Sequence, residues 1–382
     1  MRAKETVYLS LGSNLGQRRT HIQEAIFDLG QKMGPIAQVS SLYSTPAMGF
    51  AGKEFLNACV ALHTTLEPEA CLRVLLDIER SKGRKREEGT GYANRPLDID
   101  ILYYGTRTIS SEPLTLPHPR MAERQFVLRP LAEIAPQFYH PILGKDTRNL
   151  IQQCPDKSRP LKKPQPLFKT QKELLAHLGF LTIEGNIGAG KTSLTTKIAA
   201  EFNAKSILER FADNPFLPNF YKDPDRFAFP LEMSFLADRF QQFTEDTNQL
   251  DLFKDFLISD YDIYKSLIFA KVTLQEQEFD LYRKLFGFMY RETKKPRLYV
   301  FLHQTPERLL ENIKKRGRPY EQDITTAYLN SINQGYQDYL KTYPKDKQLI
   351  VDSSELDFMG NPRDYAKILA HINAHVLKER KA

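Results

Sequence analysis

The sequence contains little cysteine and no long hydrophobic run. Its 382 residues include three cysteines, Cys59, Cys71 and Cys154, whose unpaired spacing excludes a disulfide scaffold or a usual zinc site. No stretch approaches the roughly 20 uninterrupted apolar residues that a membrane helix needs. The amino terminus runs directly into an alternating strand pattern, so no signal peptide is visible. Internal repeats are absent as well. We therefore expect a cytoplasmic protein with no membrane partner.

The residues that are present indicate a folded protein of more than one domain. Hydrophobic residues make up 41% and charged residues 26%, which excludes disorder of the whole chain. The length suggests two or three domains. The net charge is +7, from 54 basic and 47 acidic residues, and this surplus favours either nucleic acid or small polyphosphates as ligands.

The composition changes between Lys157 and Lys172. This segment contains six basic residues, three prolines and no acidic residue. Such a segment cannot build a core, and its prolines favour an extended spacer. We therefore predict a basic, proline-rich linker over residues 157–176, between domains spanning 1–156 and 177–382. A nucleic-acid-binding arm is the alternative. No aromatic platform accompanies the charges, however, and we expect no nucleic-acid partner.

Hydrophobic periodicity predicts a different fold on each side of the linker. Before it, strand-like runs occur at 7–11, 36–43, 55–64 and 97–104, and helical patterns at 22–29 and 68–82. Strands that arrive in pairs between two long helices predict an α+β domain, with a largely antiparallel sheet and helices on one face. After it, apolar strands alternate with helices, the strands lying at 180–184, 297–303 and 348–352. This alternation predicts an α/β domain with a parallel sheet covered on both faces.

The loop after residues 180–184 has the spacing of a phosphate-binding loop, and it lies between a strand and a helix as that mechanism requires. Its glycines let backbone N–H groups turn toward phosphate oxygens at the positive end of the next helix. Lys191 can reach the outer phosphates, and the Thr192 hydroxyl can ligate magnesium. The predicted ATP-binding residues of this loop are Gly185, Asn186, Ile187, Gly188, Ala189, Gly190, Lys191 and Thr192.

Three segments of the second half resemble the deoxynucleoside kinases, over about residues 180–358. They are Ile183-Glu-Gly-Asn-Ile-Gly188, Tyr221-Lys-Asp-Pro224 and Arg316-Gly-Arg318-Pro-Tyr-Glu321. The resemblance implies a P-loop kinase that phosphorylates the 5′-hydroxyl of a deoxynucleoside, and a homodimer formed through this domain. It implies that Glu209 takes the 5′-hydroxyl proton and that two lid arginines, Arg316 and Arg318, neutralise charge on the transferred phosphoryl group. Tyr221 and Glu321 would bind the sugar.

The chain departs from the kinase family at two places. Ser259-Asp260-Tyr261 stands where members often carry a carboxylate followed by arginine, so the expected magnesium ligand Asp260 is kept and the arginine is lost. Glu232 stands where the family usually has a glutamine that reads the base, and an ionised carboxylate only accepts hydrogen bonds. We expect an active kinase. A catalytically silent nucleotide-binding or dimerising module stays open as the alternative.

The first half contains a carboxylate pair in Arg95-Pro-Leu97-Asp98-Ile99-Asp100. Residues two apart on a strand share a face, so Asp98 and Asp100 point the same way and the leucine and isoleucines point to the core. Two adjacent carboxylates repel each other unless a cation lies between them. Magnesium bound to a triphosphate fits, since it takes one or two carboxylates plus phosphate oxygens. A pair of surface aspartates is the alternative, which the nearby Arg84 and Arg95 disfavour.

This segment and four others closely resemble the 6-hydroxymethyl-7,8-dihydropterin pyrophosphokinases of folate biosynthesis, over about residues 6–151. The others are Gly12-Ser-Asn14, Tyr43-Ser-Thr45-Pro46, Phe55-Leu-Asn57 and Leu116-Pro-His118-Pro119. The resemblance implies a ferredoxin-like fold and transfer of the β,γ-diphosphate of ATP to the pterin hydroxymethyl oxygen, with release of AMP. Asp98 and Asp100 would hold two magnesium ions, and Arg84 and Arg95 would follow the diphosphate. The implied pterin site is Thr45, Pro46, Met48, Phe55, Asn57 and Phe126. The implied ATP site is Glu79, Arg86, Ile101, Thr115, His118 and Arg124.

The first half also departs from its family. Gly91 and Pro113 occupy places where some members carry arginines, so we expect fewer cations around the triphosphate. Residues 83–94 are rich in glycine and charge, which predicts a mobile lid. The sequence thus predicts a bifunctional ATP-dependent kinase with small-molecule substrates, two magnesium ions in the first site and one in the second.

Overall fold

The computed structural model describes residues 4–47, 52–84, 94–210, 214–220, 222–248 and 251–378. The chain forms two compact units, one built from the residues up to Leu174 together with those from Leu377, the other from Leu175–Val376. The boundary between Leu174 and Leu175 falls inside the predicted linker. No helix in the described part of the chain is long and apolar enough to cross a membrane.

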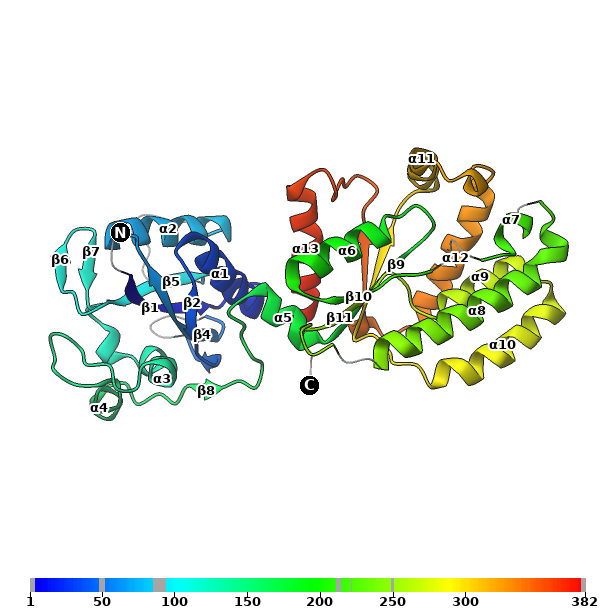
Figure 1. Ribbon diagram of the computed structural model, residues 1–382. Helices are drawn as coiled ribbons and strands as arrows, with labels where there is room; N and C mark the ends of the chain where they lie inside the picture. Colours follow the sequence, from blue (N-terminus) through cyan, green and yellow to red (C-terminus); the bar gives the residue numbers. More distant parts are fainter. Residues whose placement is uncertain are drawn as a thin grey trace. The chain divides into compact units, whose positions relative to one another are not determined.

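The first unit is an antiparallel sheet with helices on both faces (Figure 1). Its helices are α1 (Arg18–Lys32), α2 (Pro68–Ser81), α3 (Gln125–Ile134) and α4 (Thr147–Gln153). Its strands are β1 (Glu5–Ser13), β2 (Ile36–Val39), β3 (Tyr43–Thr45), β4 (Phe55–Thr64), β5 (Asp98–Tyr104) and β8 (Leu161–Lys162), with a separate hairpin of β6 (Ile109–Ser111) and β7 (Leu114–Leu116). The sheet order is β5-β1-β4-β3-β8, and β2 also pairs with β4.

Two hydrophobic clusters explain the two covered faces. Alternate residues of β1, β4 and β5, such as Leu9 and Ile99, pack against α1 and α2. The intervening residues Cys59 and Tyr103 point to the opposite face, where they pack against Leu131 of α3. The prediction of helices on one face was therefore wrong. The sequence patterns predict no helix over the residues of α3. The second face of the sheet is apolar, so it must be buried, and this becomes evident only when the strands are assembled.

The segment predicted as a linker, residues 157–176, packs against the first unit and is not an isolated spacer. Leu161 and Lys162 form β8, which pairs with β3. Gln23 of α1, fully buried, donates to the Phe168 carbonyl at 2.6 Å and accepts from the Phe168 N–H at 2.8 Å. Residues from Gln171 form α5 (Gln171–Leu178). A composition too polar to form its own core can still add an edge strand to an existing sheet, because the sheet supplies the hydrogen-bond partners.

The second unit is a parallel five-stranded sheet in the order β10-β11-β9-β12-β13. Its strands are β9 (Phe180–Gly185), β10 (Lys205–Ile207), β11 (Leu257–Ser259), β12 (Leu298–His303) and β13 (Gln348–Asp352). Its helices are α6 (Lys191–Phe202), α7 (Leu217–Phe220), α8 (Pro224–Asn248), α9 (Lys265–Thr273), α10 (Glu276–Arg291), α11 (Pro306–Arg316), α12 (Thr326–Thr342) and α13 (Pro362–Leu377). The predicted α/β architecture is confirmed.

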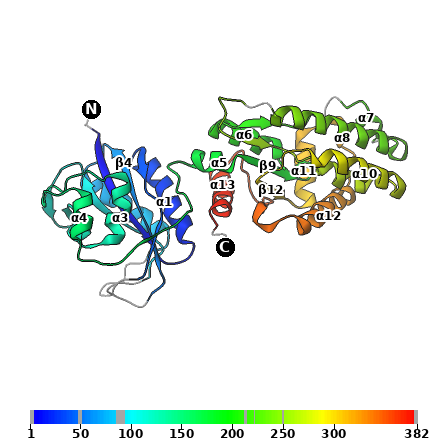
Figure 2. The same cartoon turned by 90° about the horizontal axis from the view of Figure 1, so that it is seen from below.

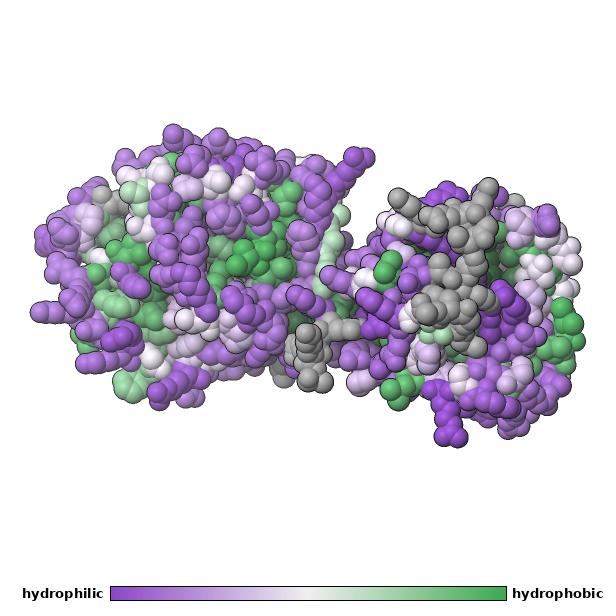
Figure 3. All heavy atoms as spheres, turned by 180° about the vertical axis from the view of Figure 1, so that it is seen from behind, coloured by the Kyte–Doolittle hydropathy of each residue, from purple (hydrophilic) through white to green (hydrophobic). Residues whose placement is uncertain are grey.

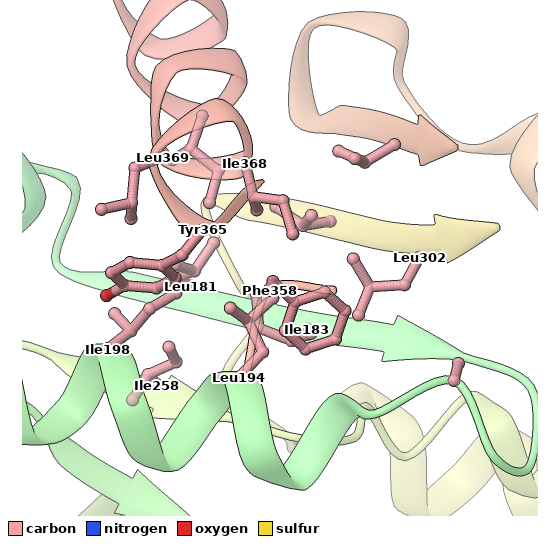
Figure 4. Close-up of a cluster of buried hydrophobic side chains, with 14 of the residues drawn as sticks. Leu181, Ile183, Leu194, Ile198, Ile258, Leu302, Phe358, Tyr365, Ile368 and Leu369 are labelled. Atoms are coloured by element: carbon pink, nitrogen blue, oxygen red, sulfur yellow. The ribbon is translucent and has the colours of Figure 1, made fainter. Parts of the chain in front are cut away.

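Both faces of the parallel sheet are buried. On one face Ile183 of β9 meets Leu194 and Ile198 of α6 and Ile368 of α13 (Figure 4). The other face is covered by α8, α9, α10 and α12, and α8 and α10 run alongside each other (Figures 1 and 2). The surface is largely hydrophilic with hydrophobic patches between the polar side chains (Figure 3). The segments that follow the carboxyl ends of β9, β10 and β11 carry the phosphate-binding loop, Glu209 and Asp260 respectively.

Candidate active sites

The first unit contains a cavity of about 430 Å³. Its floor is formed by β1, β4 and β5, where the register places Ser10 opposite Asp100 and Gly12 between Asp98 and Asn57. The cavity is lined by Ser10, Gly12, Thr45, Pro46, Phe55, Asn57, Arg84, Arg95, Asp98, Asp100, His118, Arg120, Arg124 and Phe126. The structure thus brings together residues that lie between positions 10 and 126 of this unit.

The carboxylate pair lies in this cavity with two arginines. Asp98 and Asp100 are half-buried on one face of β5, whereas Ile99 is buried in the core, as the alternation predicts. Asp98 accepts from Arg84 at 2.5 Å and from Arg95 at 2.7 Å. Burial and the neighbouring Asp98 raise the pKa of Asp100 to about 6. Two adjacent carboxylates repel each other, and a divalent cation bound between them would relieve this repulsion.

Glu79 supports the carboxylate pair from behind and does not line the cavity. Its side chain is 3% exposed, accepts from the Ile99 N–H at 2.8 Å and pairs with Arg84. Glu79 therefore holds Arg84 in place, and its contact with ATP stays a prediction. Two other expected ATP contacts, Ile101 and Thr115, are also absent from the cavity lining. The Ile101 side chain is in the core, because it shares the inward face of β5 with Ile99.

The predicted pterin residues form one side of the cavity. Asn57 donates to the Thr45 hydroxyl at 2.9 Å, which fixes the orientation of its amide. A Cβ at Gly12 would lie 3.4 Å from the Asn57 Oδ1, so glycine leaves the space beside this amide open. Phe55 and Phe126 supply aromatic surface, as a flat heterocycle requires. The predicted contact Met48 lies outside the described residues.

Histidine and arginine side chains line the cavity beside the carboxylates. Burial and the nearby Arg124 and Arg120 lower the pKa of His118 to about 4, so its ring is neutral at pH 7. His118 Nδ1 accepts from the Arg120 backbone N–H at 3.2 Å, so the proton of the neutral ring is on Nε2. Sequence reasoning missed Arg120, although it stands in the same run as His118 and Arg124. The predicted ATP contact Arg86 lies outside the described residues.

The second site begins at the phosphate-binding loop between β9 and α6. Gly188 and Gly190 both have φ of +82°. A Cβ would approach the Leu309 carbonyl to 2.8 Å at Gly188 and the Phe358 ring to 2.7 Å at Gly190, so both positions require glycine. Lys191 Nζ donates to the Asn186 carbonyl at 2.9 Å. Burial and the charge of Lys265 lower the pKa of Lys191 to about 8.

Asp260 connects this loop to the expected catalytic carboxylate. It follows β11, accepts from the Thr192 hydroxyl at 2.5 Å and accepts from the Glu209 N–H at 2.8 Å. A hydroxyl and a carboxylate side by side at the end of a phosphate loop are suitable magnesium ligands. Among the described residues no group of three or more histidine, cysteine or carboxylate side chains is placed to hold a metal ion. The candidate magnesium sites accordingly depend on phosphate oxygens for further ligands.

Two cations that sequence reasoning missed hold Glu209. Its side chain is 9% exposed and lies 2.7 Å from Arg239 and 2.6 Å from Lys265. Burial alone would raise the pKa of Glu209, but Lys265 and Arg239 hold it well below the usual range. Arg239 comes from α8 and Lys265 from the start of α9, so no local sequence pattern connects them with Glu209.

Glu232 lies on α8 and is 3% exposed. Its Oε1 accepts from the Thr273 hydroxyl at 3.0 Å, and its buried Oε2 has no hydrogen-bond partner among the described residues. Burial raises the pKa of Glu232 to about 7, against the nearby Arg239, which lowers it. A buried carboxylate oxygen without a partner needs a donor, and a bound ligand can supply one.

The lid arginines lie at a second cavity of about 550 Å³ that includes the phosphate loop. Arg316 donates to Glu321 Oε2 at 2.5 Å and Arg318 to Glu321 Oε1 at 3.2 Å. The cavity is also lined by residues that sequence reasoning did not select, among them Gln304, Arg308, Asn312, Lys315, Asp357 and Phe358. The predicted sugar contact Tyr221 lies outside the described residues.

Each of the two sites lies in a segment that matches a known protein family. Residues 181–377 match the deoxynucleoside kinase family, and residues 8–136 match the 7,8-dihydro-6-hydroxymethylpterin-pyrophosphokinase family. The chain belongs to both families. It is a bifunctional kinase of two fused domains, and the alternative of a silent second module is not favoured.

Three relatives illustrate the match. The deoxyguanosine kinase of Bacillus subtilis is 38% identical over 198 residues, which are 50% of this chain and 95% of that kinase. The deoxyadenosine kinase of Dictyostelium discoideum is 33% identical over 166 residues, 42% of this chain and 66% of that kinase. The 2-amino-4-hydroxy-6-hydroxymethyldihydropteridine pyrophosphokinase of Synechocystis is 41% identical over 146 residues, 38% of this chain and 74% of that enzyme.

Proposed function

We propose that the first unit transfers the β,γ-diphosphate of ATP to the hydroxymethyl oxygen of 6-hydroxymethyl-7,8-dihydropterin and releases AMP. The observation that carries this proposal is the cavity in which Asp98 and Asp100 lie beside Arg84, Arg95 and the Phe55 aromatic surface. Magnesium, two ions by the family's habit, would be held by the two aspartates and would neutralise the triphosphate. The cavity combines groups for an aromatic ring with groups for phosphate.

One group of residues in the first site would bind the pterin, and another group would bind ATP. Phe55 and Phe126 would hold the pterin ring, and the Asn57 amide would bind its polar edge. Arg84 and Arg95 now pair with Asp98, and they would exchange this carboxylate for the diphosphate when the substrates bind. The neutral His118 would donate from Nε2 to the nucleotide. The nucleotide contacts of Arg86, Ile101 and Thr115 stay predictions, as does the pterin contact of Met48.

The second unit would phosphorylate the 5′-hydroxyl of a deoxynucleoside with ATP. The loop 185–192 would bind the phosphates, and Thr192 with Asp260 would hold one magnesium ion, which neutralises charge on them. Arg316 and Arg318 are paired with Glu321 and would move to the transferred phosphoryl group. Glu209 would orient the 5′-hydroxyl and accept its proton. Tyr221 and Glu321 remain the predicted contacts of the sugar.

Deoxyguanosine is the substrate that this site favours. Guanine offers two adjacent donors, N1–H and the N2 amino group, to a carboxylate acceptor. Glu232 Oε2 is buried without a donor, so guanine would satisfy it. Adenine offers one donor beside an acceptor, which a carboxylate cannot bind at both positions. The kinase of Bacillus subtilis is named for deoxyguanosine, in agreement with this choice.

The two activities release different products, so one assay separates them. ADP would mark phosphoryl transfer to each of four deoxynucleosides, and AMP would mark diphosphate transfer to the pterin. Asp98→Ala should abolish magnesium-dependent AMP release and leave ADP release intact, whereas Glu209→Gln should do the reverse. Each variant is thus the control for the other. If no deoxynucleoside gives ADP, the second unit is a silent module; full-rate ADP release by Glu209→Gln would remove Glu209 from the mechanism.

The remaining expectations on partners stay predictions. We infer a homodimer through the second unit, since α10 exposes the side chains of Leu281 and Phe288, 50% and 71% accessible.

Binding of DNA or RNA through Lys162 and Lys163 is not expected. If it occurs, neutralising both lysines should weaken it and reduce its salt dependence. The cytoplasmic location and the boundaries at residues 156 and 177 also stay predictions.

A further inference from the structure

Lys265 is a buried cation at the start of a helix, beside the expected catalytic carboxylate. It is the first residue of α9, where the helix dipole disfavours a positive charge, and its side chain is only 7% exposed. Its Nζ lies 2.6 Å from Glu209 Oε2. Apart from the Phe269 ring, 5.3 Å away, no other group among the described residues contacts this ammonium. Burying a lysine with a single ion-pair partner is costly, and two of its three N–H donors remain available.

The hydrogen bonds of Glu209 show where the acceptor hydroxyl must bind. Arg239 Nε donates to Glu209 Oε1 at 2.8 Å, and Arg239 Nη2 forms an ion pair with the same oxygen at 2.7 Å. Two nitrogens of Arg239 therefore lie against Oε1, one as a hydrogen-bond donor and one as an ion-pair partner. Within the described parts of the chain, Oε2 accepts from Lys265 alone and keeps one lone pair. A hydroxyl that gives its proton to Glu209 therefore binds Oε2, directly beside the ammonium of Lys265.

Among the described residues, two other side chains near this point are fixed by their own contacts. Arg239 uses Nη1 to donate to the Ser266 hydroxyl at 2.8 Å, so its guanidinium is fixed on both sides. Tyr261, at the place where kinase relatives often carry arginine, is fully buried in the hydrophobic cluster beneath α8 and α10. The charge of Lys265 also acts on Lys191 of the phosphate loop. Lys265 thus contacts Glu209 directly and lies near the lysine of the phosphate loop.

We propose that Lys265 is a further catalytic residue of the second unit, whose ammonium contacts the phosphoryl group during transfer in place of the missing arginine. This rests on the proposed deoxynucleoside kinase function. In the step, the 5′-oxygen forms a bond to the γ-phosphorus, and the bond from this phosphorus to the bridging oxygen breaks. That oxygen leaves with ADP, and the 5′-hydroxyl proton passes to Glu209 Oε2. Lys265 keeps its proton and stabilises the charge on the non-bridging oxygens.

A first test replaces Lys265 by methionine and by arginine, with Lys271→Met as the control at an exposed position of the same helix. With deoxyguanosine and ATP, kcat of Lys265→Met should fall about 100-fold, with KM for the nucleoside changing less than about fivefold. Lys265→Arg should retain most of kcat, since the charge is kept, and Lys271→Met should match wild type. A Lys265→Met enzyme with kcat within about threefold of wild type would overturn the proposal. If this variant does not fold, Lys265→Gln replaces it.

A double-mutant cycle separates contact with the phosphoryl group from simple positioning of Glu209. If Lys265 acts on the phosphoryl group, adding Lys265→Met to Glu209→Gln lowers the residual kcat further, by at least about tenfold. If it acts only through Glu209, the double variant is no slower than Glu209→Gln alone, and the proposal is overturned. Absence of ADP release by the wild-type enzyme with every deoxynucleoside would instead contradict the proposed function. The two failures are therefore distinguishable.

Discussion

Replacement of Glu232 by glutamine tests how the second unit selects its base. The substitution keeps the size of the side chain but replaces a carboxylate oxygen by an amino group, which faces the guanine donors with another donor. Loss of one hydrogen bond to a charged group costs about 1.5–3 kcal/mol. Because each 1.4 kcal/mol is tenfold, kcat/KM for deoxyguanosine should fall about 10- to 150-fold. Deoxyadenosine, whose donor and acceptor match an amide, should gain relative to deoxyguanosine.

The pH dependence of kcat/KM gives an independent check of the role of Glu232 in binding the base. Burial raises the pKa of Glu232 to about 7, so the carboxylate that guanine requires forms as the pH rises through 7. In the wild type, the ratio of kcat/KM for deoxyguanosine to that for deoxyadenosine should therefore increase from pH 6 to pH 8. In the Glu232→Gln variant, this ratio should not change with pH. The folded state binds this proton more tightly than the unfolded state, so the stability of the free enzyme falls as the pH rises from about 4.5 to about 7 and then levels off.

The assay measures ADP release with both nucleosides for the wild type, Glu232→Gln and Glu245→Gln. Glu245 is exposed on the same helix, so its replacement controls for the loss of one negative charge on α8. The ratio cancels the ionisations that affect both substrates alike. An unchanged deoxyguanosine-to-deoxyadenosine ratio in Glu232→Gln, or a ratio in the wild type that does not vary with pH, would refute the assignment of Glu232 to the base.

Three further predictions concern the first unit. Asp98→Asn should eliminate magnesium-dependent AMP release while ADP release continues, and AMP release at the wild-type rate would contradict the metal assignment. Arg120→Ala should raise KM for ATP about tenfold with little change in kcat, because one charge-assisted contact is lost, whereas the exposed Arg129→Ala should change neither. Gln23→Ala should lower the free energy of unfolding by about 2–4 kcal/mol in chemical denaturation, because the buried N–H and carbonyl of Phe168 lose their partner; an unchanged value would show that the docked segment contributes no stability.

Local patterns were sufficient for the parts of the sites that lie on one element. The alternation along β5 placed Asp98 and Asp100 on one face, and the glycine spacing placed Lys191 and Thr192 at the start of α6. Both patterns depend on short-range geometry, the period of a strand and the turn before a helix. Local patterns did not show that Glu79 supports Arg84 and the Ile99 N–H from behind, because these contacts join α2 to the strand β5.

Contacts between distant segments were decided only by the tertiary structure. Glu209 is 30 residues from Arg239 and 56 from Lys265, and neither cation belongs to a recognisable motif. A buried carboxylate needs compensating charge, but the sequence does not tell which helices will bring it. The segment around Phe168 shows the same limit, since its composition indicates a spacer and its docking depends on Gln23 in α1.

The sequence by itself therefore determined that this chain contains two phosphate-handling domains, because their loops and carboxylates are encoded at short range. Only the tertiary structure decided which side chains balance each buried charge, that α3 covers the second face of the first sheet, and that the basic segment adds an edge strand to it. The physical reason is that burial and electrostatic compensation depend on neighbours in space, and these are assembled from residues far apart in the chain.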